Sequence, residues 1–228
     1  MNMTQHLSLK RLNIPLFLQT IFPAFCVSTF ASLMLFFRLY KSWQHDAWYL
    51  AFGWNLFLAW VPLFISIWLQ WKHQQQKLSK ITLLFFLGCW LLFLPNSPYI
   101  ITDLLHIRHR GIGSVPIWFD TLFFFTFALA GLQAGMFSLY FVQKLLNHYF
   151  NEKLVWVFVI AVLLLTGFGM YLGRELRWNS WDIISQPLAL SYVIINQLFN
   201  IVALQFTFTY FVAMKIFYLM FIYQREMR

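Results

Sequence analysis

Long apolar stretches separated by short polar segments run along the whole chain. A helix that crosses a bilayer needs about 20 mostly apolar residues. The stretches that reach this length cover residues 14–37, 48–71, 81–101, 117–143, 154–173 and 198–220. The pattern predicts an all-α integral membrane protein, a bundle of about six transmembrane helices that forms a single polytopic domain over residues 1–228.

The third apolar stretch contains two prolines close together, Pro95 and Pro98. Proline has no backbone donor, so an α-helix cannot pass through it undisturbed. Ser97 precedes a proline, and this position disfavours the α conformation. We therefore predict that the third helix is broken at Pro95–Pro98, at membrane depth.

A broken helix inside a membrane needs polar partners. Irregular backbone persists there only where protein groups or water satisfy it. Asn55 lies two turns into the second stretch, and Asn96 lies between Pro95 and Pro98. We expect Asn55 or Asn96 to bond the backbone groups that the two prolines leave free, which gives Asn55, Pro95 and Pro98 a structural role.

The last of these stretches belongs to a longer apolar segment, residues 188–223, which is too long for one span. Asn196 and Asn200 interrupt it, so we predict a split near Asn196–Asn200. Residues 187–197 would then lie along the membrane interface, and residues 198–220 would cross the membrane. Residues 101–110, which follow the break in the third helix, are predicted to be interfacial as well.

Two glycine pairs occur on consecutive predicted helices. Gly131 and Gly135 lie in the fourth stretch, and Gly169 and Gly173 lie in the fifth. Glycines four residues apart share one helix face and let another backbone approach closely. The two pairs predict close packing of the fourth helix against the fifth.

Composition and charge agree with a membrane protein. The chain is 61% hydrophobic and 10% charged, whereas a soluble domain has roughly 25% charged residues. The net charge of +9 is explained by Lys and Arg in cytoplasmic loops that face anionic lipid. No basic cluster interleaved with aromatic residues stands on a soluble module, so nucleic-acid binding is excluded. Cys26 and Cys89 are too few for a disulfide framework and are expected to be buried.

The distribution of basic residues predicts the orientation. The larger share of the 16 Lys and Arg residues falls on the side of the two chain ends. The positive-inside rule then places both termini in the cytoplasm. Most of the acids fall on the opposite, outer side, together with several arginines. The outer charges are therefore expected to pair with one another.

Asp103, His106 and Asp120 are the candidate catalytic residues. Asp103 and His106 share one face of a helix at i, i+3, where they could bind a metal or form a base with its orienting carboxylate. An ordinary polar contact on an interfacial helix also explains the spacing, and more simply. Asp120 lies close to lipid, where acids are functional candidates. It also falls in a first helical turn, after Pro116, where the helix dipole favours an acid.

Arg174 and Arg177 are the candidate ligand-binding residues, at i, i+3 on the end of the fifth helix. Arginine forks suit carboxylate and phosphate. Alternatively, the two arginines pair with the outer acids. The same predicted ligand site includes four further polar side chains on the outer side, which are Asn96, Tyr99, Asn179 and Asp182. Asn179 and Asp182 also have the spacing of a capping box.

Several of these segments together resemble an uncharacterised bacterial membrane family, domain of unknown function 1361. The resemblance rests on five segments, which are Asn55–Pro62, Phe93–Leu104, Pro116–Asp120, Tyr171–Arg174 and Arg177–Asp182. It covers roughly residues 50–190. The resemblance implies a bacterial multi-pass protein of the inner membrane, and it brings no established activity.

The leading functional hypothesis is a polar site on the outer face of the membrane that binds or processes an anionic lipid or small molecule. Arg174 and Arg177 would hold its phosphate or carboxylate, and Asp103, His106 and Asp120 would supply acid–base or metal chemistry. One alternative is a transporter or channel component, because broken helices also mark transport sites. Another is a non-catalytic assembly partner with a structural charge network. The lipid bilayer is the only partner the sequence identifies; it specifies no metal, cofactor or protein partner.

Overall fold

The computed structural model describes residues 14–46, 49–109 and 115–226, and the side chains of residues 21–41, 49–105 and 115–225. All regular structure in these ranges is helical. The elements are α1 (Ile14–Asp46), α2 (Leu50–Gln74), α3 (Lys80–Phe93), α4 (Asn96–Tyr99), the 3₁₀ segment η2 (Ile100–His109), α5 (Ile117–Leu146), α6 (Glu152–Leu176), α7 (Asp182–Ser185), α8 (Pro187–Gln197) and α9 (Ile201–Glu226). Among the described residues, six helical segments are long and apolar enough to cross a membrane.

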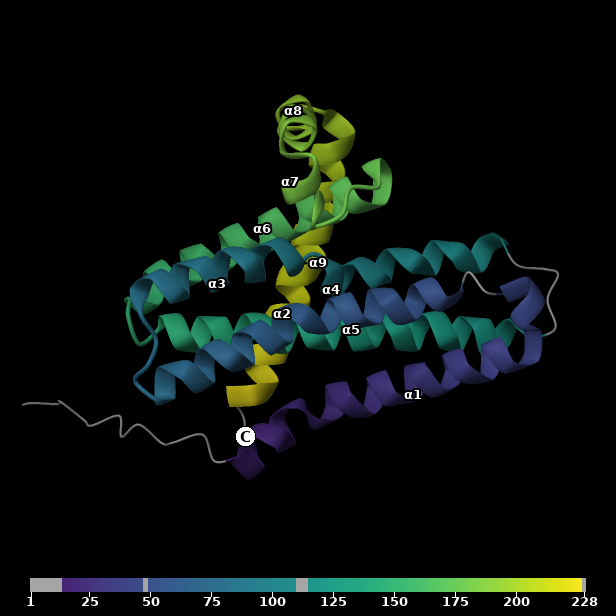
Figure 1. The fold of residues 1–228 in the computed structure, drawn as a ribbon, viewed down its shortest axis with the longest axis horizontal. Coiled ribbons are helices and arrows are strands. Elements are labelled where there is room, and N and C mark those ends of the chain that lie inside the picture. The colour runs from purple at the N-terminus through teal and green to yellow at the C-terminus, as the bar shows by residue number, and fades with distance from the viewer. Residues whose placement is uncertain (1–13, 47–48, 110–114, 227–228) are drawn as a thin grey trace, which may run out of the picture.

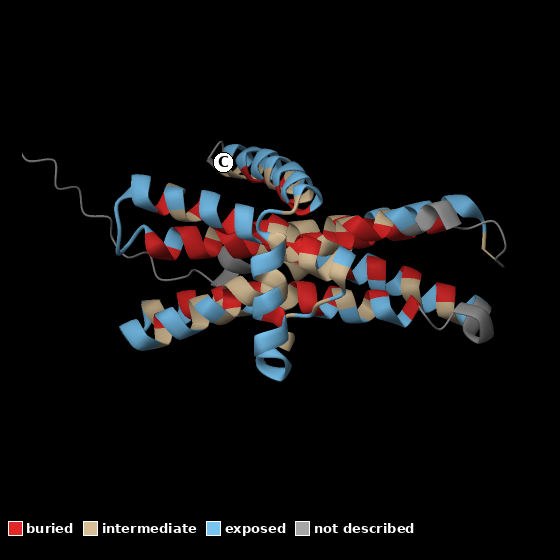
Figure 2. Ribbon diagram, turned by 90° about the horizontal axis from the view of Figure 1, so that it is seen from above, coloured by how far each residue is buried: buried red, intermediate tan, exposed pale blue. Residues whose placement is uncertain are grey.

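Helix α5 forms the centre of the bundle. Helices α1 and α2 pack along it, α4 and η2 cover its face, and α6 packs chiefly against α9. Figure 1 shows α1, α2 and α5 running side by side, while α9 runs at a steep angle to them. Buried residues concentrate between the helices, and the outward faces are exposed (Figure 2). The apolar outward faces are those that lipid would cover.

The third helix is broken where the prolines predict. Helix α3 ends at Phe93, and the short helix α4 follows. The chain does not become extended at Ser97, as the following proline had suggested, because Ser97 lies within α4. Its amide donates to the Leu94 carbonyl at 3.1 Å, and its hydroxyl donates to the Ala59 carbonyl of α2 at 2.7 Å. At the break, the backbone therefore stays helical but changes its hydrogen-bond pattern, and the contact with Ala59 holds this part of the chain against α2.

Two side chains bond the carbonyl groups that the break leaves free. Asn96 Nδ2 donates to the Phe93 carbonyl at 3.0 Å, as predicted for Asn96. Ser180, from the turn after α6, donates its hydroxyl to the Leu92 carbonyl at 2.9 Å. Asn96 Nδ2 also donates to Ser180 Oγ at 2.9 Å. The turn after α6 is thus fastened to the break.

The predicted close packing of α5 against α6 through their glycine pairs is wrong. A Cβ added at Gly131 would overlap the Ser97 carbonyl oxygen of α4, and one at Gly135 would lie 3.0 Å from Ser97 Cβ. A Cβ at Gly169 would lie 2.6 Å from Pro95 Cγ. Both glycine pairs therefore face the broken helix, because its displaced backbone needs small neighbours on two sides.

The segment after the break packs into the bundle. Thr102 and Asp103 are buried and η2 packs against α5, while the interfacial position expected for residues 101–110 stays a prediction. The segment is also a 3₁₀ helix, in which residues three apart eclipse. By length and composition, the third candidate membrane segment runs from Lys80 through Leu105 and so includes the first part of η2.

The end of the chain agrees with prediction. Helix α8 ends at Gln197, and α9 begins at Ile201, so the last apolar segment is split as expected. The Tyr171 hydroxyl of α6 donates to Gln197 Oε1 at 3.0 Å and anchors the end of α8. The expectation of buried cysteines is wrong for Cys26, which is exposed on α1, and only partly met for Cys89, which is half-buried; both thiols are free.

Candidate functional site

Asp103 forms the centre of the candidate site. Arg174 Nη1, from the last turn of α6, donates to Asp103 Oδ1 at 3.0 Å. Asn55 Nδ2, from α2, donates to Asp103 Oδ2 at 3.4 Å. Both carboxylate oxygens thus have partners, which a buried acid requires. Asn55 was an alternative partner for the helix break, but it binds this carboxylate instead.

The end of α6 is shaped by Arg177. This residue has a left-handed backbone (φ 59°, ψ 30°), and the Trp178 amide after it donates to the Leu172 carbonyl at 3.1 Å. The arrangement satisfies a carbonyl at the helix end. The Arg177 side chain is exposed, whereas Arg174 is largely covered. The two predicted ligand-binding arginines therefore lie in different environments at the same helix end.

The turn that follows α6 is held by Asp182. Its Oδ2 accepts from the Asn179 amide at 2.7 Å and from Asn179 Nδ2 at 3.3 Å, and its Oδ1 accepts from the Ser185 hydroxyl at 3.1 Å. The hydrogen bond from the Asn179 amide is the main reason why the pKa of Asp182 lies below its usual value. One half of the predicted capping box is present, because the acid accepts the Asn179 amide.

The other two predicted ligand residues lie in the broken helix. Asn96 is engaged with the Phe93 carbonyl and Ser180. The Tyr99 ring packs beside α6, where a Cβ added at Gly173 would lie 3.2 Å from Tyr99 Cε2. These contacts give Asn96 and Tyr99 a part in placing η2, which carries Asp103, against the end of α6.

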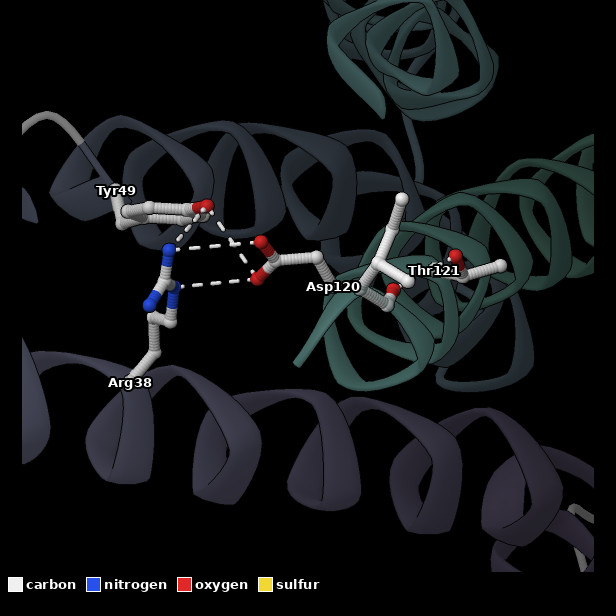
Figure 3. A network of polar contacts seen from close by, with 5 residues as sticks. Arg38, Tyr49, Asp120 and Thr121 are labelled. Atoms are coloured by element: carbon white, nitrogen blue, oxygen red, sulfur yellow. Dashed lines mark hydrogen bonds and ion pairs between the residues drawn. The ribbon is translucent and has the colours of Figure 1, made fainter. Parts of the chain in front are cut away.

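Asp120 belongs to a second, separate cluster at the start of α5 (Figure 3). Arg38 Nε of α1 lies 3.2 Å from Asp120 Oδ1. The Tyr49 hydroxyl donates to Asp120 Oδ1 at 3.4 Å and accepts from Arg38 Nη2 at 3.1 Å. The Arg38 guanidinium also lies over the Tyr49 ring, 4.7 Å from its centre. This cluster joins α1 to α2 and α5.

The structure places the two candidate catalytic acids in different ion pairs. Asp103 and Asp120 each pair with an arginine of their own. The side chain of His106 lies outside the described residues. Within the described ranges, no group of three or more His, Cys, Asp or Glu side chains could hold a metal. The acid–base role of Asp103, His106 and Asp120 stays a prediction.

Arg38, Tyr49 and Ser180 contribute to these clusters and were not singled out from the sequence. Arg38 had been placed in an outer loop just beyond the first span, but α1 continues to Asp46. The signal was present, because Arg38 follows an unbroken apolar run, and an ionisable residue there needs a partner in the bundle. Tyr49 and Ser180 gave no such signal, since their partners come from distant helices.

Six apolar helices and an all-helical fold define a multi-pass membrane protein. A family model described as protein of unknown function (DUF1361) matches residues 54–222. The chain belongs to this family, and the match includes the break and the residues around Asp103. No curated protein and no solved structure matches the chain.

Proposed function

We propose that this membrane protein binds the phosphate or carboxylate group of an anionic lipid or small molecule at the end of α6. The observation that carries the proposal is a difference between the two ion pairs. The Arg38 side chain is 1% exposed in its pair with Asp120, whereas the Arg174 side chain is 15% exposed in its pair with Asp103. The first pair is sealed, and the second is open at its arginine.

A guanidinium presents five donors in a planar fork. Arg174 Nη1 donates to Asp103, which holds the guanidinium in place. The side chain is 15% exposed, so the guanidinium would meet an anion from outside while the contact with Asp103 is kept. Arg177, one turn further, is exposed and adds a second positive charge that attracts the same anion.

The surroundings favour a lipid headgroup as the source of the anion. Trp54 and Trp181 lie beside this end of the bundle, with ring centres 6.5 Å apart, and both are exposed. Tryptophan is enriched at the membrane–water interface. We place the site at the outer face of a bacterial inner membrane, with both termini in the cytoplasm, from the Lys and Arg distribution.

Lipid binding by matched variants tests the proposal. Arg177→Asn removes the charge, while asparagine tolerates the left-handed backbone. Lys41→Ala removes an exposed cation of α1 and serves as the control. Native mass spectrometry in mild detergent would compare phosphatidylglycerol with phosphatidylcholine. We expect Arg177→Asn to weaken the preference for phosphatidylglycerol roughly tenfold, because a hydrogen bond to a charged group is worth about 1.5 kcal/mol, and Lys41→Ala to retain it.

Arg174→Lys provides the second arm. Lysine keeps the charge beside Asp103 but lacks the fork, so we expect a folded variant with weakened lipid preference. Inorganic phosphate added as a competitor separates the sources: it displaces the lipid if a free phosphate group suffices. Equal preference in Arg177→Asn, Lys41→Ala and the unmodified protein would refute the proposal.

A structural charge network is the second candidate function. Both buried acids already pair with an arginine of the same chain. In a membrane assembly protein, such ion pairs would fix the positions of the helices relative to one another. This reading predicts that the Arg174 and Arg177 variants change stability and leave lipid preference unchanged, so the same experiment separates the two functions.

A further inference from the structure

We infer a binding site for a divalent transition-metal ion, of the Zn²⁺, Cu²⁺ or Ni²⁺ class, formed by His73 and His148 at the other end of the bundle. His73 lies in the last turn of α2, and His148 lies in the turn between α5 and α6. Their rings are adjacent, with centres 4.9 Å apart and planes inclined by 62°. This inference does not depend on the proposed lipid site.

The packing of α2 along α5 brings the two histidines together. Gln70, one turn before His73, donates from its buried Nε2 to the Phe141 carbonyl of α5 at 2.6 Å. On the other side, the His148 amide donates to the Leu145 carbonyl at 3.1 Å, which fixes the turn after α5. Both imidazoles therefore project from backbone that is held in place.

The ring separation suits a shared metal ion. Zinc lies about 2.0–2.1 Å from a ligating imidazole nitrogen. Two imidazoles that meet one tetrahedral ion consequently have ring centres roughly 5 Å apart. The observed 4.9 Å agrees with that separation.

The hydrogen bonds of the two rings leave their Nε2 atoms for the metal. His148 Nδ1 lies 2.8 Å from the Lys144 carbonyl oxygen, which can only accept, so Nδ1 carries the proton. His73 Nδ1 lies 2.8 Å from the Tyr149 hydroxyl. His73 Nε2 is buried and has no hydrogen-bond partner. Metal-ligating histidines usually bond their other nitrogen in this way.

The neighbouring charges and ligand number set the class of ion. No third His, Cys, Asp or Glu joins the pair among the residues that the structure describes, so water would fill the remaining positions. Imidazole favours Zn²⁺, Cu²⁺ and Ni²⁺ over Mg²⁺ and Ca²⁺. Lys72 holds its ammonium 5.5 Å from the ring centres of both Trp68 and Trp71, so its charge lies against those indoles.

Titration of the detergent-solubilised full chain, without a histidine tag, tests the site. Zn²⁺ alone would be the probe, measured by competition with a chromophoric chelator. We expect one saturable Zn²⁺ per chain, lost in His148→Ala, which changes an exposed residue. Tyr149→Phe removes the hydroxyl partner of His73 and should weaken binding about 10- to 100-fold, as loss of such an outer partner does.

His45→Ala is the matched control, because it removes an imidazole elsewhere in the chain. Zn²⁺ should raise the thermal midpoint of the unmodified protein and of His45→Ala, because ligand binding stabilises the folded state, and should leave that of His148→Ala unchanged. Binding that persists in His148→Ala, or falls equally in His45→Ala, means an adventitious ion only and overturns the inference. Absence of saturable binding in the unmodified protein overturns it as well.

Discussion

Gly131→Ala tests whether the glycine pair of α5 exists to accommodate the broken helix. The added Cβ would overlap the Ser97 carbonyl oxygen and lie 3.0 Å from Ile100 Cδ1. The carbonyl belongs to the backbone, and Ser97 is tied to the Ala59 carbonyl at 2.7 Å. The neighbour therefore cannot move aside without breaking other contacts.

Two opposing effects decide the magnitude. Alanine is favoured over glycine in a helix by about 1 kcal/mol. Overpacking a closely packed contact costs about 1–3 kcal/mol, and occasionally more. Because the overlapped atom is backbone, the upper part of that range applies, and we expect a net loss of about 1–2 kcal/mol in the free energy of unfolding.

Gly88→Ala is the matched control. A Cβ at Gly88 of α3 would meet nothing within 4 Å, so the same substitution keeps only the favourable propensity. Reversible unfolding in mixed detergent micelles, followed by circular dichroism, would compare the two variants. If Gly131→Ala is as stable as Gly88→Ala, α4 does not approach α5 as closely as described, and the reasoning fails.

Three further predictions follow from individual contacts. Ser180→Ala leaves the Leu92 carbonyl without its partner and should lower stability by about 1 kcal/mol, seen as a lower thermal midpoint. Asp120→Leu alone should lower the free energy of unfolding by about 3–5 kcal/mol, because it removes the carboxylate that pairs with the buried Arg38. Combining it with Arg38→Met should recover most of this loss. A double-mutant cycle measures the coupling between the two residues. The pKa of Asp182 is lowered in the folded state, so its ionised carboxylate stabilises that state at any pH above the unfolded-state pKa of about 3.9. Asp182→Asn should therefore have a lower thermal midpoint than the unmodified protein at neutral pH. This difference should vanish as the pH falls through the folded-state pKa of Asp182.

Apolar length and proline chemistry were sufficient to predict the class of fold. The six apolar segments, the break at Pro95–Pro98 and the split between α8 and α9 are local properties, because each depends on residues close in sequence. The partner of a glycine pair is not local. A glycine pair allows close approach by any helix and does not specify which one. The sequence therefore could not show that Gly131 and Gly169 contact the broken helix.

The candidate site was predicted in part for the same reason. The sequence proposed that the outer charges pair with one another, and Asp103 does pair with Arg174. It could not assign Asp120 to Arg38, because the first apolar stretch was expected to end before that arginine. The end of an apolar run does not mark the end of the helix that contains it, since α1 continues to Asp46, so a charged residue just beyond the run can join either the loop or the bundle.

The broken helix also determines the geometry of the proposed ligand site. Ser97 is tied to α2, and Ser180 fastens the turn after α6 to the same break. Asp103 follows the break on η2, and Arg174 precedes the turn on α6, so the 3.0 Å contact between them depends on both attachments. These attachments at the break therefore help to hold the partly exposed Arg174 side chain in its contact with Asp103. Ser180→Ala should accordingly weaken lipid preference along with stability, although Ser180 need not touch the lipid.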